Sequence, residues 1–195
     1  MSYVKTGIDS IFAGLMISIG AIIYLSCPNR IVGAFLFSVG LITIMEFGFK
    51  LYTGVIGFVR TFDQTARAIF TLGWNTVGCL FIHLVPVTGA NAVWESRLDT
   101  PIITVFAKAF ICGILIFLCV SKKDTITTMV AISAFILCGA EHSVADICFM
   151  FAAKDITAKG LLFILIVAVG NAAGSLSVSL WTQYREQIKQ RSKGT

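Results

Sequence analysis

Three ionisable side chains lie close together in the middle of an otherwise apolar stretch of the sequence. Glu141, His142 and Asp146 all fall within residues 138–146, CGAEHSVAD. Ionisable groups at membrane depth are costly, and by default they mark a path for an ion or a proton. Histidine suits proton transfer because its unperturbed pKa is about 6.5. These residues therefore predict a path for an ion or a proton at this stretch. On the residues alone, the alternative for His142 is a buried neutral histidine bonded to a backbone carbonyl.

The composition indicates an integral membrane protein. Of the 195 residues, 57% are hydrophobic and only 13% are charged, whereas soluble domains have about 25% charged residues. The six cysteines form no CxxC pair, so neither a disulfide framework nor a metal site is expected. No nucleophile–base pair, phosphate loop or metal-ligand spacing is present, and we expect neither catalysis nor a cofactor. The basic C-terminal tail predicts a cytoplasmic, membrane-flanking end rather than nucleic-acid binding.

Six apolar segments are each near the length of about 20 residues that a membrane-spanning helix needs. The second and fifth are too long for one plain span. The segments cover residues 8–26, 31–59, 68–87, 101–120, 125–153 and 160–181.

The order of segment lengths predicts a duplicated half. Each half runs normal, long, normal, and each long segment is interrupted by glycine and polar residues, at 48–54 (GFKLYTG) and 138–146. The third and sixth segments both contain Asn-x-x-Gly, beginning at Asn75 and Asn171. An odd number of spans per half requires the second half to be inverted in the membrane. We therefore expect one all-α transmembrane channel domain over 1–195. It would comprise inverted three-helix repeats at about 7–87 and 101–182, broken second and fifth helices, and a basic tail at 183–195.

The distribution of basic residues predicts the orientation. Positive charges are enriched in cytoplasmic loops, and the two sides of the expected topology carry nine and four of them. The richer side would place both termini in the cytoplasm. It carries Lys5, Arg60, Arg67, Lys122, Lys123, Arg185, Lys189, Arg191 and Lys193, and the other carries Arg30, Arg97, Lys154 and Lys159.

Several of these motifs resemble those of the formate/nitrite transporter family. Residues 138–146 are similar to that family's Gly-Phe-Glu-His-Ser-Val-Ala-Asn motif. Residues 37–41 (FSVGL) and 48–54 resemble its second-helix pattern, and residues 170–174 (GNAAG) resemble its last-helix Gly-Asn-x-x-Gly-Gly. The resemblance runs from about Gly7 to Tyr184, with all six segments in order.

The resemblance implies a fold, an activity and a set of site residues. It implies an aquaporin-like protomer in a homopentamer in the lipid bilayer, expected here to be the bacterial inner membrane. Each pore would pass small monovalent anions of weak acids, such as formate, nitrite or hydrosulfide, possibly with protons. His142 would be the central pore histidine, able to protonate the anion in transit and faced by Thr53, with Asn171 lining the pore nearby. Glu141 would have a structural role, since a carboxylate facing an anion would repel it. Apolar constrictions would be formed by Phe37, Leu41 and Phe135, whereas Asn75 would hold its own loop.

The sequence also departs from the family pattern, most notably in charge. Lys50 stands where the family usually has an acidic residue, and Asp146 stands where it has asparagine. A buried charge needs a partner, so one hypothesis pairs Lys50 with Glu141, or else with Asp146 or Glu46. Lys108 is the candidate for the family's pore-associated lysine.

Two other function classes are compatible with these residues. The first is a channel for a small neutral solute such as ammonia, water or urea, whose flux would survive loss of His142. The second is a membrane subunit holding haem between His83 and His142, which an absorbance spectrum would reveal.

Overall fold

The computed structural model describes residues 3–122 and 124–193, and these are helical throughout with short connections. Lys123, which contributes to the orientation argument, lies outside the described residues. The helices are α1 (Tyr3–Ser26), α2 (Arg30–Phe47), α3 (Tyr52–Val55), α4 (Phe62–Cys79), α5 (Ala90–Leu98), α6 (Ile102–Lys122), α7 (Thr125–Leu137), α8 (Ser143–Ala152) and α9 (Ala158–Lys193). Two short 3-10 helices follow α3 and α4, at Ile56–Phe58 and Leu80–Leu84.

Four helices of the described chain are long and apolar enough to cross a membrane: α1, α2, α6 and α9. The segment expected at 68–87 differs, because α4 begins at Phe62 and gives way to a 3-10 helix after Cys79. Thr61 caps the start of α4 by accepting a hydrogen bond from the backbone N–H of Gln64 at 3.3 Å. The polar stretch 88–100 contains α5, and α9 runs on through the expected tail as far as Lys193.

Both overlong segments are interrupted by the same local structure. Gly48 ends α2 and Gly139 follows the end of α7, each with a φ of +69°. The next backbone N–H then returns to the helix: Phe49 N donates to Ile44 O at 3.0 Å, and Ala140 N donates to Phe135 O at 2.8 Å. This is the Schellman motif, in which a glycine in the left-handed region satisfies the last helical carbonyls. Each break then leads into a second, shorter helix.

Glycines allow two helix pairs to pack backbone against backbone. α1 crosses α4 at Gly14 and Gly78, and α6 crosses α9 at Gly113 and Gly174. A Cβ on Gly14 would collide with the carbonyl oxygen of Asn75, and a Cβ on Gly113 with that of Asn171. Small residues at helix crossings are typical of membrane proteins, where close packing replaces the hydrophobic effect.

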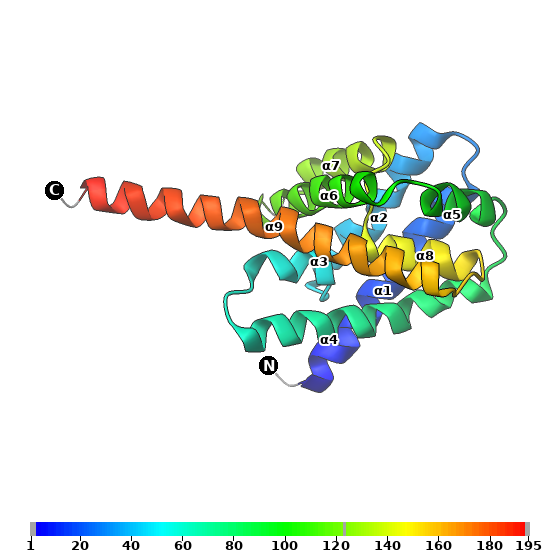
Figure 1. Ribbon diagram of the computed structural model, residues 1–195, viewed down its shortest axis with the longest axis horizontal. Helices are drawn as coiled ribbons and strands as arrows, with labels where there is room; N and C mark the ends of the chain where they lie inside the picture. Colours follow the sequence, from blue (N-terminus) through cyan, green and yellow to red (C-terminus); the bar gives the residue numbers. More distant parts are fainter. Residues whose placement is uncertain (1–2, 123, 194–195) are drawn as a thin grey trace.

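The helices form one bundle from which the last third of α9 projects (Figure 1). The short helix α5 lies at the end of the bundle opposite to this projection. Trp94 fixes α5 in place, since its side chain is 1% exposed and its Nε1 donates to Asp155 Oδ2 at 2.8 Å.

Candidate functional site

His142 occupies the N-terminus of α8, directly after the second helix break. Its ring is buried, and Nδ1 accepts a hydrogen bond from the backbone N–H of Ala145 at 3.1 Å. The other ring nitrogen, Nε2, lies 2.9 Å from Oγ1 of Thr53 in α3. Because Nδ1 is an acceptor, the neutral ring carries its proton on Nε2 and donates it to Thr53. Thr53 and His142, predicted as a facing pair, are therefore in contact across the two breaks.

The two asparagines of the Asn-x-x-Gly motifs hold the two breaks in the same way. Asn75 accepts from Tyr52 N at 2.9 Å and donates to the carbonyls of Ser10 and Lys50, both at 2.8 Å. Asn171 accepts from Ser143 N at 2.9 Å and donates to two further carbonyls, those of Ala109 at 2.9 Å and Glu141 at 2.8 Å. These bonds satisfy backbone groups that each break exposes, as a buried loop requires.

Asn171 therefore differs from its expected role. It was expected to line the pore near His142, but its amide oxygen and its amide nitrogen both bond to the backbone, and its side chain is fully buried. Its place in the structure matches that of Asn75, which is expected to hold its own loop.

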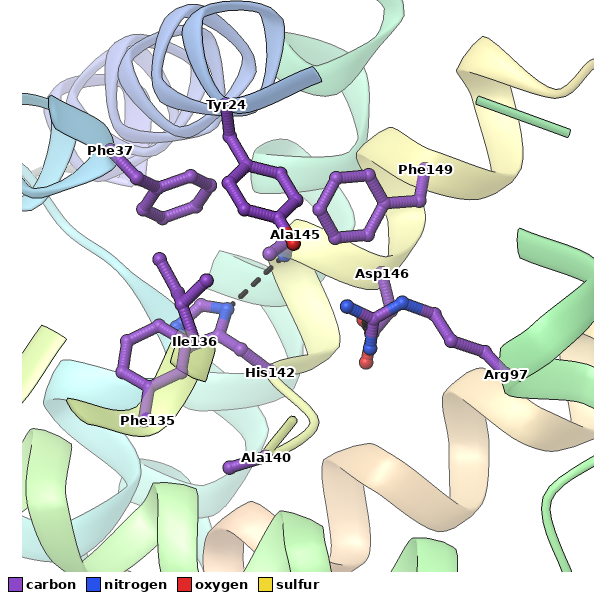
Figure 2. Close-up of a pocket in the computed structure, with 10 residues that line it drawn as sticks. All are labelled: Tyr24, Phe37, Arg97, Phe135, Ile136, Ala140, His142, Ala145, Asp146 and Phe149. Carbon is purple, nitrogen blue, oxygen red and sulfur yellow. Dashed lines mark hydrogen bonds and ion pairs between the residues drawn. The ribbon is translucent and has the colours of Figure 1, made fainter. Parts of the chain in front are cut away.

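A small cavity of about 10 Å³ adjoins His142 on the side of the α2 N-terminus. It is walled by aromatic rings (Figure 2). Phe135 stacks on the His142 ring at 5.9 Å between centroids, and Phe37 meets Phe135 edge-on at 6.4 Å. The lining residues are Tyr24, Phe37, Arg97, Phe135, Ile136, Ala140, His142, Ala145, Asp146 and Phe149.

A second, much larger cavity of about 750 Å³ opens on the side of the α2 C-terminus. Leu41 lies on its wall, one helical turn along α2 from Phe37, and Lys50 and Glu46 also line it. Along α2, the two cavities are thus separated by the turn that contains Phe37 and Leu41. Both side chains are 2% exposed, so they form an apolar partition beside the Thr53–His142 pair.

A buried ionic cluster forms part of the wall of the small cavity. The guanidinium of Arg97, on α5, contacts Glu141 Oε2 and lies 3.1 Å from Asp146 Oδ1. Lys108 Nζ approaches Glu141 Oε1 from α6 at 3.9 Å. The side chains of Glu141 and Asp146 are only 2% and 1% exposed. Two buried carboxylates thus share one arginine, with a lysine at longer range.

The hypothesis that Lys50 pairs with Glu141 or Asp146 is wrong, because Arg97 and Lys108 hold these positions. Among the described residues Lys50 forms no ion pair, with Glu46 or otherwise. Its backbone is fixed by Asp9 and Asn75, and it borders the large cavity.

Arg97 is not among the residues that the sequence predicts for the site, because it lies in a polar stretch outside the six apolar segments. A signal was nevertheless present. Two carboxylates in an apolar segment require buried cations, and Arg97 lies three residues after a tryptophan that can anchor a short helix.

The two histidines are not arranged as a haem pair. Both ring nitrogens of His142 are hydrogen-bonded, whereas His83 is exposed and stacks on Phe151 with 5.3 Å between centroids.

Comparison with known proteins decides the family. The profile described as "Formate/nitrite transporter" matches residues 1–185. The chain belongs to the formate/nitrite transporter family.

Solved structures share the fold of this formate/nitrite transporter at low sequence identity. One, described as "Pentameric formate channel with formate bound", has a TM-score of 0.81 and 16% identity and covers 95% of this chain and 98% of its own. Another, an "FNT family ion channel", has a TM-score of 0.84 and 21% identity and covers 93% and 90%. No curated protein sequence matches the chain.

Proposed function

We propose that this formate/nitrite transporter is a channel for small monovalent anions of weak acids, of the formate, nitrite and hydrosulfide class. The observation that carries the proposal is the buried Thr53–His142 pair beside an apolar partition. The partition resists hydrated ions, as hydrophobic constrictions do. A solved formate channel with the same fold supports the class of substrate.

The finer architecture belongs to the same proposal. We propose a protomer of six spans in two inverted repeats, at about 7–87 and 101–182, followed by a basic cytoplasmic tail at 183–195. Matching Schellman breaks, matching asparagine brackets and matching glycine crossings support the duplication. The pentameric state of the similar formate channel supports a homopentamer. The proposed location is the bacterial inner membrane with both termini in the cytoplasm, and the excess of basic residues on one side supports that orientation.

The apolar partition excludes charge because desolvating an anion costs far more than one hydrogen bond returns. Phe37, Leu41 and Phe135 form this barrier, and Thr53 and His142 lower it. Thr53 Oγ1 already accepts the Nε2 proton, so its own hydroxyl proton is available to an approaching anion.

Full neutralisation of the anion requires one further proton. The His142 ring takes it up from water at a cavity mouth, passes a proton to the anion and returns to its neutral form. Uptake at Nδ1 ends the hydrogen bond from Ala145 N–H, so proton transfer is linked to the first turn of α8. The weak acid then crosses the partition as a neutral molecule.

A flux panel in proteoliposomes tests this function. Formate, nitrite, hydrosulfide, lactate and chloride are compared at two pH values for the parent protein and His142→Ala. The first three should pass. Chloride should be retained because its conjugate acid is too strong to form in the pore. His142→Ala should lower anion flux by about 100-fold, the lower end of the range for a lost proton-transfer group.

The matched control is His83→Ala, which removes the exposed histidine outside both cavities and should leave flux unchanged. The opposite pattern would point to a neutral-solute channel. In that case ammonia or urea would cross, the anions would not, and His142→Ala would make no difference.

A further inference from the structure

One guanidinium between two buried carboxylates is an unusual neighbour for an anion path. Figure 2 shows the Arg97 side chain reaching from α5 to Asp146 beneath the ring of Phe149. The guanidinium carbon lies 4.7 Å from the centre of that ring. Stacking occupies a face of the guanidinium and leaves its edge, which carries the N–H donors, toward the carboxylates.

The hydrogen-bonding capacity of this cluster is not used up. Within residues 3–122 and 124–193, Arg97 Nε has no hydrogen-bond acceptor and Asp146 Oδ2 has no donor, although both atoms are buried. Buried polar groups are normally satisfied. Arg97 and Asp146 line the small cavity together with His142, and its volume of about 10 Å³ is close to that of a single water site.

The two carboxylates are not equivalent. Glu141 has a second cation, Lys108, at 3.9 Å, and its backbone carbonyl is held by Asn171. Asp146 has Arg97 as its ion-pair partner at 3.1 Å, and its carboxylate lies on the cavity wall. Of the two, Asp146 therefore occupies the place where a diffusible anion would meet the guanidinium.

We propose that the Asp146 carboxylate is a built-in competitor of the transported anion for the Arg97 guanidinium. The inference rests on the proposed function and names a residue that sets its affinity. The ligand class is a planar monovalent oxoanion with two oxygens, such as formate or nitrite, which matches the guanidinium fork as a carboxylate does. Entry of the anion displaces the Asp146 carboxylate from Arg97, and departure of the anion restores the pair.

The test is Asp146→Asn, which keeps the side-chain shape and one oxygen for Arg97 but removes the competing charge. The half-saturation concentration for formate and nitrite in proteoliposomes should fall by roughly tenfold, because one unit of negative charge next to the site is removed. Hydrosulfide binds through a single sulfur and should change less. Asp146→Ser is measured in parallel and should show the same direction, so a folding defect in one variant leaves the other to decide.

Asp99→Asn is the matched control. It also removes one carboxylate near α5, but Asp99 is 81% exposed, pairs with Lys159 at 3.6 Å and lies outside the cavity. Its half-saturation concentrations should equal those of the parent protein. The inference is overturned if the Asp146 variants bind formate no more tightly than the parent, or if Asp99→Asn shifts affinity equally.

A second readout separates this inference from the proposed function. Thermal unfolding of the purified protein in detergent is followed against increasing formate and nitrite concentration. Asp146→Asn should be stabilised at lower anion concentrations than the parent protein, whether or not flux is observed. Absence of anion flux in the parent protein defeats the proposed function alone. Equal stabilisation of parent and variant by the anion defeats the competitor role alone.

Discussion

In the proposed channel, the Thr53–His142 contact would fix which protons the pore can offer. Ala145 N–H occupies Nδ1, so Nε2 carries the ring proton and Thr53 must accept it. A hydroxyl that accepts one bond remains free to donate another. In the proposed channel, the hydrogen-bond donor presented to an anion at this point would therefore be the Thr53 hydroxyl.

Thr53→Val tests this arrangement, because it keeps the branched shape and removes the hydroxyl. The buried Nε2–H loses its acceptor, which should lower the free energy of unfolding by about 1–3 kcal/mol. Formate flux should fall as well. Thermal unfolding in detergent and proteoliposome flux measure the two effects.

Thr53→Ser is the paired control, since it retains the hydroxyl and loses only a methyl group. It should recover most of the flux and stability that Thr53→Val loses. Equal behaviour of the Val and Ser variants would show that the hydroxyl has no part in either property.

At this scale, sequence reasoning placed some residues better than others. The pairing of Thr53 with His142 was expected from the resemblance of both segments to one family. The partner of Glu141 was not, because Lys50 is its counterpart in the repeat whereas Arg97 reaches it from a different helix. A repeat predicts equivalent backbone positions, but it does not predict which distant side chain neutralises a buried charge.

At the scale of elements, the two helix breaks depend on glycines in the left-handed region. A residue with a Cβ pays about 1–2 kcal/mol in that conformation. Gly48 has no heavy atom within 4 Å of an added Cβ, and Gly139 has only Lys108 Nζ at 3.7 Å. The cost of substitution is therefore conformational at both positions.

Gly48→Ala and Gly139→Ala should each lower the free energy of unfolding by about 1 kcal/mol. Chemical or thermal unfolding in detergent provides the measurement. Similar losses at the two positions would agree with the similar geometry, and unchanged stability in both variants would contradict the role of the left-handed caps.

Gly73→Ala is a control that should change the free energy of unfolding in the opposite direction. Gly73 lies inside α4, has ordinary helical φ and has no heavy atom within 4 Å of an added Cβ. Alanine is the better helix former by about 0.8–1.0 kcal/mol, so this variant should be more stable than the parent protein.

The apolar segments of the sequence predict both helix breaks correctly, but several of their ends differ from the helix ends in the structure. Glycine and polar residues within an overlong apolar run predict an interruption, and both interruptions are present. Apolar runs mark lipid-facing or buried residues, whereas capping and backbone bonds decide where a helix begins. The Thr61 cap therefore starts α4 well before its apolar stretch, and α5 forms in a stretch that hydropathy reads as polar loop.

At the scale of the whole molecule, the projecting end of α9 makes few contacts with the bundle. The described side chains beyond Leu180 are mostly or wholly exposed. Among the described residues, the last hydrogen bonds between this part and the bundle come from Arg60, which donates to Ser179 Oγ and to Gln183 Oε1. The bundle is complete before the basic residues of the tail begin.

Truncation after Tyr184 should therefore change the free energy of unfolding by less than about 0.5 kcal/mol, as for other exposed sites. Formate flux should also persist. Thermal unfolding and the proteoliposome assay check both expectations, and a large loss of either would reveal a role for the extension.

At the glycine crossings of α1 with α4 and of α6 with α9, the backbones touch directly. No side chain lies between them that could move aside. A frame of this kind resists sliding, so in the proposed channel we expect passage to depend on side-chain rotations of the aromatic wall and of Arg97. Helix shifts take microseconds to milliseconds, and passage should not wait for a step of that kind. Stopped-flow uptake of formate by proteoliposomes should accordingly begin without a lag.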